Sequence, residues 1–76
     1  MSNLALQAPA GAGELQDSIA EFVALAEIHF AEVQVQLDDG NLDSAIEQSR
    51  FAETNLATAR ALMLEARELE AMVRGS

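Results

Sequence analysis

The sequence contains no cysteine, so neither disulfides nor thiolate zinc sites can stabilise its fold, and the redox compartment cannot be inferred. Four basic residues stand against thirteen acidic ones, which gives a formal net charge of -9. This charge would repel phosphate backbones and anionic membrane surfaces, so we expect no nucleic-acid partner. No apolar run approaches the roughly 20 residues needed to span a bilayer, so we expect no membrane insertion.

The single proline, Pro9, lies near the amino terminus with Gly11 and Gly13 close behind it. This composition predicts a flexible tail over residues 1–13. Leu4 and Leu6 could allow the tail to dock as a short extended peptide. No basic segment is followed by an apolar run of signal-peptide length, so the cytoplasm is the expected location.

Apolar residues then recur at spacings of three and four, which predicts two long α-helices over residues 14–38 and 42–74. Between them, Gly40 suits the left-handed position after a helix and Asn41 is a good cap for the next one. The turn is therefore expected at residues 39–41. The fold class is all-α, a long antiparallel helix–turn–helix hairpin.

Each predicted helix carries one main apolar stripe. In the first helix it consists of Ile19, Val23, Ala26, Phe30, Val33 and Leu37, widened by Leu15 and Phe22. In the second helix it consists of Leu42, Ala45, Ser49, Ala52, Leu56, Ala59, Met63, Ala66 and Val73, interrupted at Glu70. The repeat of seven residues is typical of coiled-coil packing, and the alanines imply a close approach of the helices.

Further apolar side chains lie away from these stripes. They are Ala20, Ala24, Ile28, Ala31 and Val35 on the first helix and Phe51, Leu62 and Leu69 on the second. At about 1.5 Å per residue the helices would be roughly 37 and 50 Å long, so residues 67–74 would extend beyond the first helix. A helix apolar on several sides is normally buried on several sides. We therefore expect a four-helix bundle or a larger helical oligomer.

The charges are divided between the helices. The first predicted helix has acidic residues and no basic one, whereas Arg50, Arg60, Arg67 and Arg74 all lie on the second. Three of these arginines are seven residues apart and would form a stripe along one side. The stripe could face acidic residues of the first helix, from the same or another chain, or it could be a solvated surface with weak pairs.

The segment from Gly40 to Glu47, together with Ala52, resembles the turn and second helix of a tetratricopeptide repeat. The resemblance implies a helical hairpin of a family that serves as a protein-binding scaffold. The first helix departs from the family pattern, because Glu32 and Val33 stand where the family has leucine and a small residue. Only one such unit fits in the chain, whereas repeat arrays need about three.

His29 is the single histidine, and Glu32 follows it one turn later. In a symmetric dimer, two copies of this pair could hold a metal as in ferritin-like bundles, although the Glu-x-x-His order of those sites is absent. The alternative is a structural histidine with a hydrogen bond. The serines lack a plausible base apart from His29, and no glycine-rich phosphate loop is present, so we expect no enzyme and no cofactor.

The sequence thus predicts a non-enzymatic structural or protein-interaction module: a self-associating acidic hairpin that acts as an adaptor, small accessory subunit or chaperone. The alternative is a ferritin-like metal-binding bundle formed by oligomerisation, with His29 and Glu32 as ligands. The expected partners are a second copy of the chain and another protein. The expected anchors of the core and interface are Phe22, Ile28, Phe30, Val35, Phe51, Leu56, Leu62 and Leu69.

Overall fold

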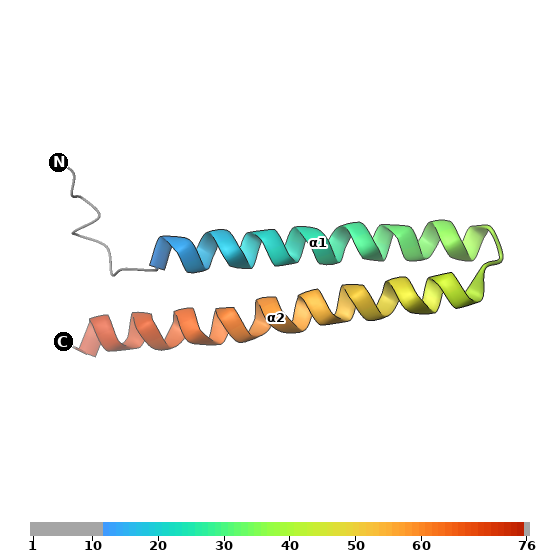
Figure 1. Cartoon of the computed structure of the whole chain (residues 1–76). Coiled ribbons are helices and arrows are strands. Elements are labelled where there is room, and N and C mark those ends of the chain that lie inside the picture. Colours follow the sequence, from blue (N-terminus) through green and yellow to red (C-terminus); the bar gives the residue numbers. More distant parts are fainter. Residues whose placement is uncertain (1–11, 76) are drawn as a thin grey trace.

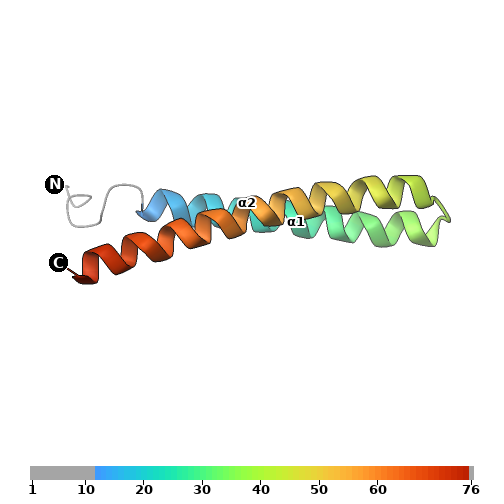
Figure 2. The ribbon, with the colours of Figure 1, turned by 90° about the horizontal axis from the view of Figure 1, so that it is seen from below.

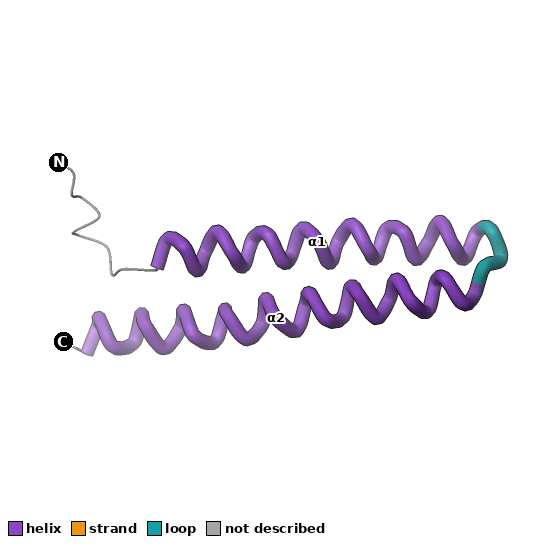
Figure 3. Tube along the Cα trace, in the orientation of Figure 1, coloured by secondary structure: helices purple, strands orange, loops and turns teal. Residues whose placement is uncertain are grey.

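A computed structural model describes residues 12–75, which form two antiparallel helices joined by a tight turn (Figures 1 and 3). Helix α1 spans Ala12–Asp38 and helix α2 spans Leu42–Gly75, with 27 and 34 residues. The all-helical hairpin predicted from the sequence is confirmed. Helix α1 includes Ala12 and Gly13, the last two residues of the predicted tail; the rest of the predicted tail, including Leu4 and Leu6, lies outside the described residues.

The turn satisfies the backbone groups that both helix ends leave open. Gly40 has a φ of +77°, and its N–H donates to the carbonyl of Leu37 at 3.0 Å. The N–H of Asn41 donates to the carbonyl of Gln36 at 2.8 Å, which completes a Schellman motif. The Asn41 side-chain oxygen then accepts from the N–H of Ser44 at 3.3 Å, as an N-cap of α2 does.

The contact between the helices follows a repeat of seven residues. Its centre on α2 is the alanine line Ala45, Ala52 and Ala59, and on α1 it is Ile19, Ala26 and Val33. Three residues further along, a second contact line is half-buried on each helix. It consists of Phe22, His29 and Gln36 on α1 and of Gln48, Asn55, Leu62 and Leu69 on α2. The pair therefore packs like an antiparallel coiled coil.

The interior of the hairpin is made of alanine. Ala26, Ala45, Ala52 and Ala59 are the buried residues of the described chain, with exposed fractions of 4% or less. No large side chain in this part of the chain is fully buried, because two helices alone cannot enclose one. The Cα atoms extend over 54 × 26 × 11 Å. Figure 1 shows the two helices side by side in one layer, and in the perpendicular view of Figure 2 they cross near their middles.

The second line of the α2 seam differs from the prediction. Leu62 and Leu69, predicted to lie away from the seam, are half-buried on it, whereas Met63 and Val73 are exposed. The sequence pattern favoured the line through Leu42, Leu56 and Met63 because the true second line carries two polar residues, Gln48 and Asn55, in the first half of α2. On α1, Phe30 and Leu37 of the predicted stripe are each 45% exposed.

Helix α2 continues beyond the start of α1, as its greater length predicted. At this end Met72 is 66% exposed and Val73 is 55% exposed. Within the described range, neither helix combines the length and apolar character of a membrane span.

We predict that Gly40→Ala destabilises the hairpin by about 1–2 kcal/mol, because a side chain at positive φ is strained even though no atom lies within 4 Å of the added Cβ. Gly13→Ala is the matched control: Gly13 is helical, its added Cβ also meets nothing within 4 Å, and the change should stabilise by up to about 1 kcal/mol. Urea unfolding at one fixed protein concentration measures both. Equal effects of the two substitutions would contradict the role assigned to Gly40.

Candidate association surfaces

The hairpin has two open sides that flank the contact between its helices. Because the helices are antiparallel, positions four residues after the central contact line of each helix lie on the same side. We call this the neutral side. Its residues are Val23, Phe30 and Leu37 of α1 and Leu42, Ser49, Leu56 and Met63 of α2. None of them is charged, and Phe30, Leu37, Leu42 and Met63 are between 43% and 63% exposed.

Positions one residue before the central contact line form the opposite side, which we call the acidic side. Its residues are Ser18, Leu25 and Glu32 of α1 and Ser44, Phe51 and Thr58 of α2. Nearer the open end, α2 continues the neutral side to Glu70 and the acidic side to Glu65. Leu25 is 38% exposed and Phe51 is 47% exposed, but the carboxylate of Glu32 and the hydroxyls of the serines and the threonine lie between these apolar side chains. The two sides therefore differ in polarity although they belong to the same two helices.

His29 takes part in a polar layer inside the contact. Its ring Nδ1 donates to Oε1 of Gln48 at 2.7 Å, which joins α1 to α2. The His29 ring also lies 5.4 Å from the ring of Phe51, centroid to centroid. One turn along α1, Nε2 of Gln36 donates to Oε2 of Glu32 at 2.8 Å. The second contact line is thus polar toward the turn and apolar toward the open end, whereas the central line is apolar throughout.

This layer bears on the predicted metal ligands. Among residues 12–75, no group of three or more histidine, aspartate or glutamate side chains is placed to hold a metal ion. One hairpin therefore does not assemble a site, and His29 and Glu32 would need ligands from a second chain. The predicted metal site remains an untested prediction. The structure adds Gln48 as the partner of His29, which the sequence reasoning did not identify. The signal for it is the repeat of seven residues, because Gln48 and Asn55 are polar residues on the same line of α2.

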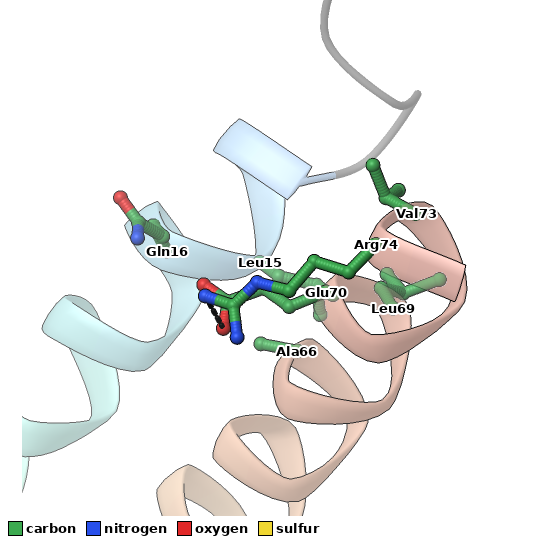
Figure 4. A pocket seen from close by; sticks show the side chains of 7 residues that line it. All are labelled: Leu15, Gln16, Ala66, Leu69, Glu70, Val73 and Arg74. Atoms are coloured by element: carbon green, nitrogen blue, oxygen red, sulfur yellow. Dashed lines mark ion pairs between the residues drawn. The ribbon is translucent and has the colours of Figure 1, made fainter. Parts of the chain in front are cut away.

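The open end of the hairpin holds a cavity of about 250 Å³ (Figure 4). It is lined by Leu15 and Gln16 of α1 and by Ala66, Leu69, Glu70, Val73 and Arg74 of α2. Nη2 of Arg74 lies 3.9 Å from Oε1 of Glu70, one turn earlier on the same helix. Both side chains are largely exposed, so this pair contributes little to stability. The sequence predicted the missing cover here, but not a cavity.

The arginine stripe does not pair with α1 inside the hairpin. Arg60, Arg67 and Arg74 are exposed, and within the described range the ion pair found is the one between Arg74 and Glu70. Pairing of the stripe with another chain remains a prediction.

The predicted anchors divide into two groups. Phe22, Leu56, Leu62 and Leu69 are half-buried in the hairpin. Ile28, Phe30, Val35 and Phe51 are between 45% and 62% exposed. The second group is available to another surface, whereas the first already contributes to the contact between α1 and α2. A role of either group in an interface between chains stays a prediction.

No family model, curated protein or solved structure matches this chain. The resemblance of residues 40–52 to a tetratricopeptide repeat accordingly stays a prediction. The hairpin that the resemblance implied is present, but any tight helical turn would produce it.

We predict that Gln48→Ala lowers the free energy of unfolding by about 1 kcal/mol, because it leaves the half-buried His29 ring without its partner. Gln34→Ala is the matched control. Gln34 donates to Asp38 at 3.0 Å, but both groups are exposed on one helix, and such pairs contribute only about 0.2–0.5 kcal/mol. Urea unfolding of both variants measures the difference; a larger loss for Gln34→Ala would contradict a structural role of the His29–Gln48 bond.

Proposed function

We propose that this chain is a non-catalytic protein-association module, a helical hairpin that assembles with itself into a four-helix bundle and serves as an adaptor or small accessory subunit. The observation that carries the proposal is the imbalance between buried and exposed apolar side chains. Four alanines are buried, whereas twelve large apolar side chains of the described residues are exposed. A domain normally has at least two packed layers around a core, and one hairpin supplies a single layer.

The energy available from covering these side chains is large for so small a chain. Removing a half-exposed large apolar side chain from water contributes about 1 kcal/mol, at about 25 cal/mol per Å². Covering six of them would contribute about 6 kcal/mol per hairpin, within the range of the total stability of many folded domains. Part of this gain offsets the loss of translational and rotational freedom on association. Assembly and stability are therefore expected to be coupled.

The chemistry of the side chains supports association over catalysis. His29 is engaged with Gln48 and packs against Phe51. The cavity at the open end is lined mainly by apolar side chains, and its two charged residues, Glu70 and Arg74, pair with each other. These features suit packing against another protein surface.

We predict that purified protein has a solution mass of at least twice the chain mass of 8.1 kDa, and that its thermal midpoint rises with protein concentration. Sedimentation or light scattering over roughly a hundredfold concentration range, with circular dichroism in parallel, measures both. A well-folded monomer whose midpoint is independent of concentration would contradict self-assembly. A monomer without fixed tertiary structure would instead indicate that a different protein completes the fold.

A further inference from the structure

The apolar stripe of each helix does not point straight at its partner helix. The stripe predicted for α1 combines the central contact line with Val23, Phe30 and Leu37, and the stripe of α2 combines its alanine line with Leu42, Leu56 and Met63. Both stripes are therefore turned from the contact toward the neutral side. A helix in a four-helix bundle packs against two neighbours at once, and its apolar stripe is turned in this way.

The distribution of charge distinguishes the neutral side from the rest of the surface. From Val23 to Leu37 on α1 and from Leu42 to Met63 on α2, its two lines contain no charged residue, although the chain has a net charge of -9. Over the same span the acidic side carries Glu32; beyond it, the neutral side continues to Glu70, which pairs with Arg74, and the acidic side continues to Glu65. The neutral side is thus the surface on which a second molecule of equal negative charge can pack without placing carboxylates in the contact.

We propose that the neutral side is covered by the neutral side of a second copy of this chain. This inference rests on the proposed function and specifies its partner and surface. An uncharged apolar surface is complemented by another uncharged apolar surface, and the second copy supplies one of the same length. A basic partner would instead be matched by carboxylates, which the neutral side lacks.

The charge also predicts how the dimer responds to salt. The neutral sides exclude charge from the contact, but each hairpin brings its net charge of -9 close to that of the other. Salt screens this repulsion, so the dissociation constant should fall as ionic strength rises. Binding of a basic partner would weaken under the same change. A dissociation constant that rises with salt would therefore overturn the proposal.

Two phenylalanines provide a matched test of which side of the hairpin forms the dimer interface. Phe30 lies on the neutral side and is 45% exposed, and Phe51 lies on the acidic side and is 47% exposed. Phe30→Glu should raise the dissociation constant by about a hundredfold or more, because each copy then brings an unpaired carboxylate into the contact. Phe51→Glu also removes the ring that lies 5.4 Å from the His29 ring, so circular dichroism first establishes that the helices stay folded. It should then change the dissociation constant by less than about threefold. Sedimentation velocity across a concentration series measures both.

A second test does not depend on the folding of a charged variant. The chain has no cysteine, so a single new thiol reports only its own position. Ser49 lies on the neutral side and Ser44 on the acidic side, and both are half-buried. Alkylation of Ser49→Cys should slow as protein concentration rises through the dimerisation range, whereas alkylation of Ser44→Cys should keep a constant rate. Protection of Ser44→Cys alone would overturn the proposal.

These outcomes separate this inference from the proposed function. A wild-type chain that remains a folded monomer at every concentration would overturn both. A wild-type dimer that Phe51→Glu dissociates and Phe30→Glu leaves intact would be consistent with self-association. It would overturn the assignment of the dimer interface to the neutral side. A dimer that forms only with zinc would also overturn the assignment of the interface to the neutral side, because His29 and Glu32 lie toward the acidic side of the hairpin.

Discussion

Two helices packed along one line cannot enclose a large side chain, and the rest of this structure depends on that constraint. Only the small alanine side chains fit fully between the helices. Ala45, Ala52 and Ala59 let the two backbones approach and are buried completely or nearly so. Every larger apolar residue is left partly exposed on one side or the other. The function proposed for the chain is the completion of a core that one copy cannot close.

The contact inside the hairpin is specific because it is not uniformly apolar. The bond between His29 and Gln48 joins the helices at 2.7 Å in the half near the turn, where a sliding of α1 along α2 would separate the two side chains. Near the open end, apolar residues such as Phe22, Leu62 and Leu69 accept more variation in their contacts. The polar layer can therefore set the register, while the apolar half contributes burial.

The sequence was sufficient for the two helices and the turn, because glycine, asparagine and the spacing of apolar residues are local signals. It identified the central contact lines, including Ala26 and the α2 alanines. It did not identify the second line of α2, since Gln48 and Asn55 interrupt the apolar pattern there and Leu42, Leu56 and Met63 gave a stronger one. Which of two adjacent lines faces the partner helix depends on the relative rotation of the helices, and that is a tertiary property.

That rotation has its origin in the turn. Asn41 both completes the Schellman motif of α1, through its N–H, and caps α2, through its side chain. No residue separates the two roles, so the last carbonyls of one helix and the first amides of the next are fixed by the same residue. Each added residue advances an α-helix by about 100°, at 3.6 residues per turn. The length of the turn thus determines the rotational phase of α2, and with it whether the uncharged lines of both helices meet on one side or lie on different ones.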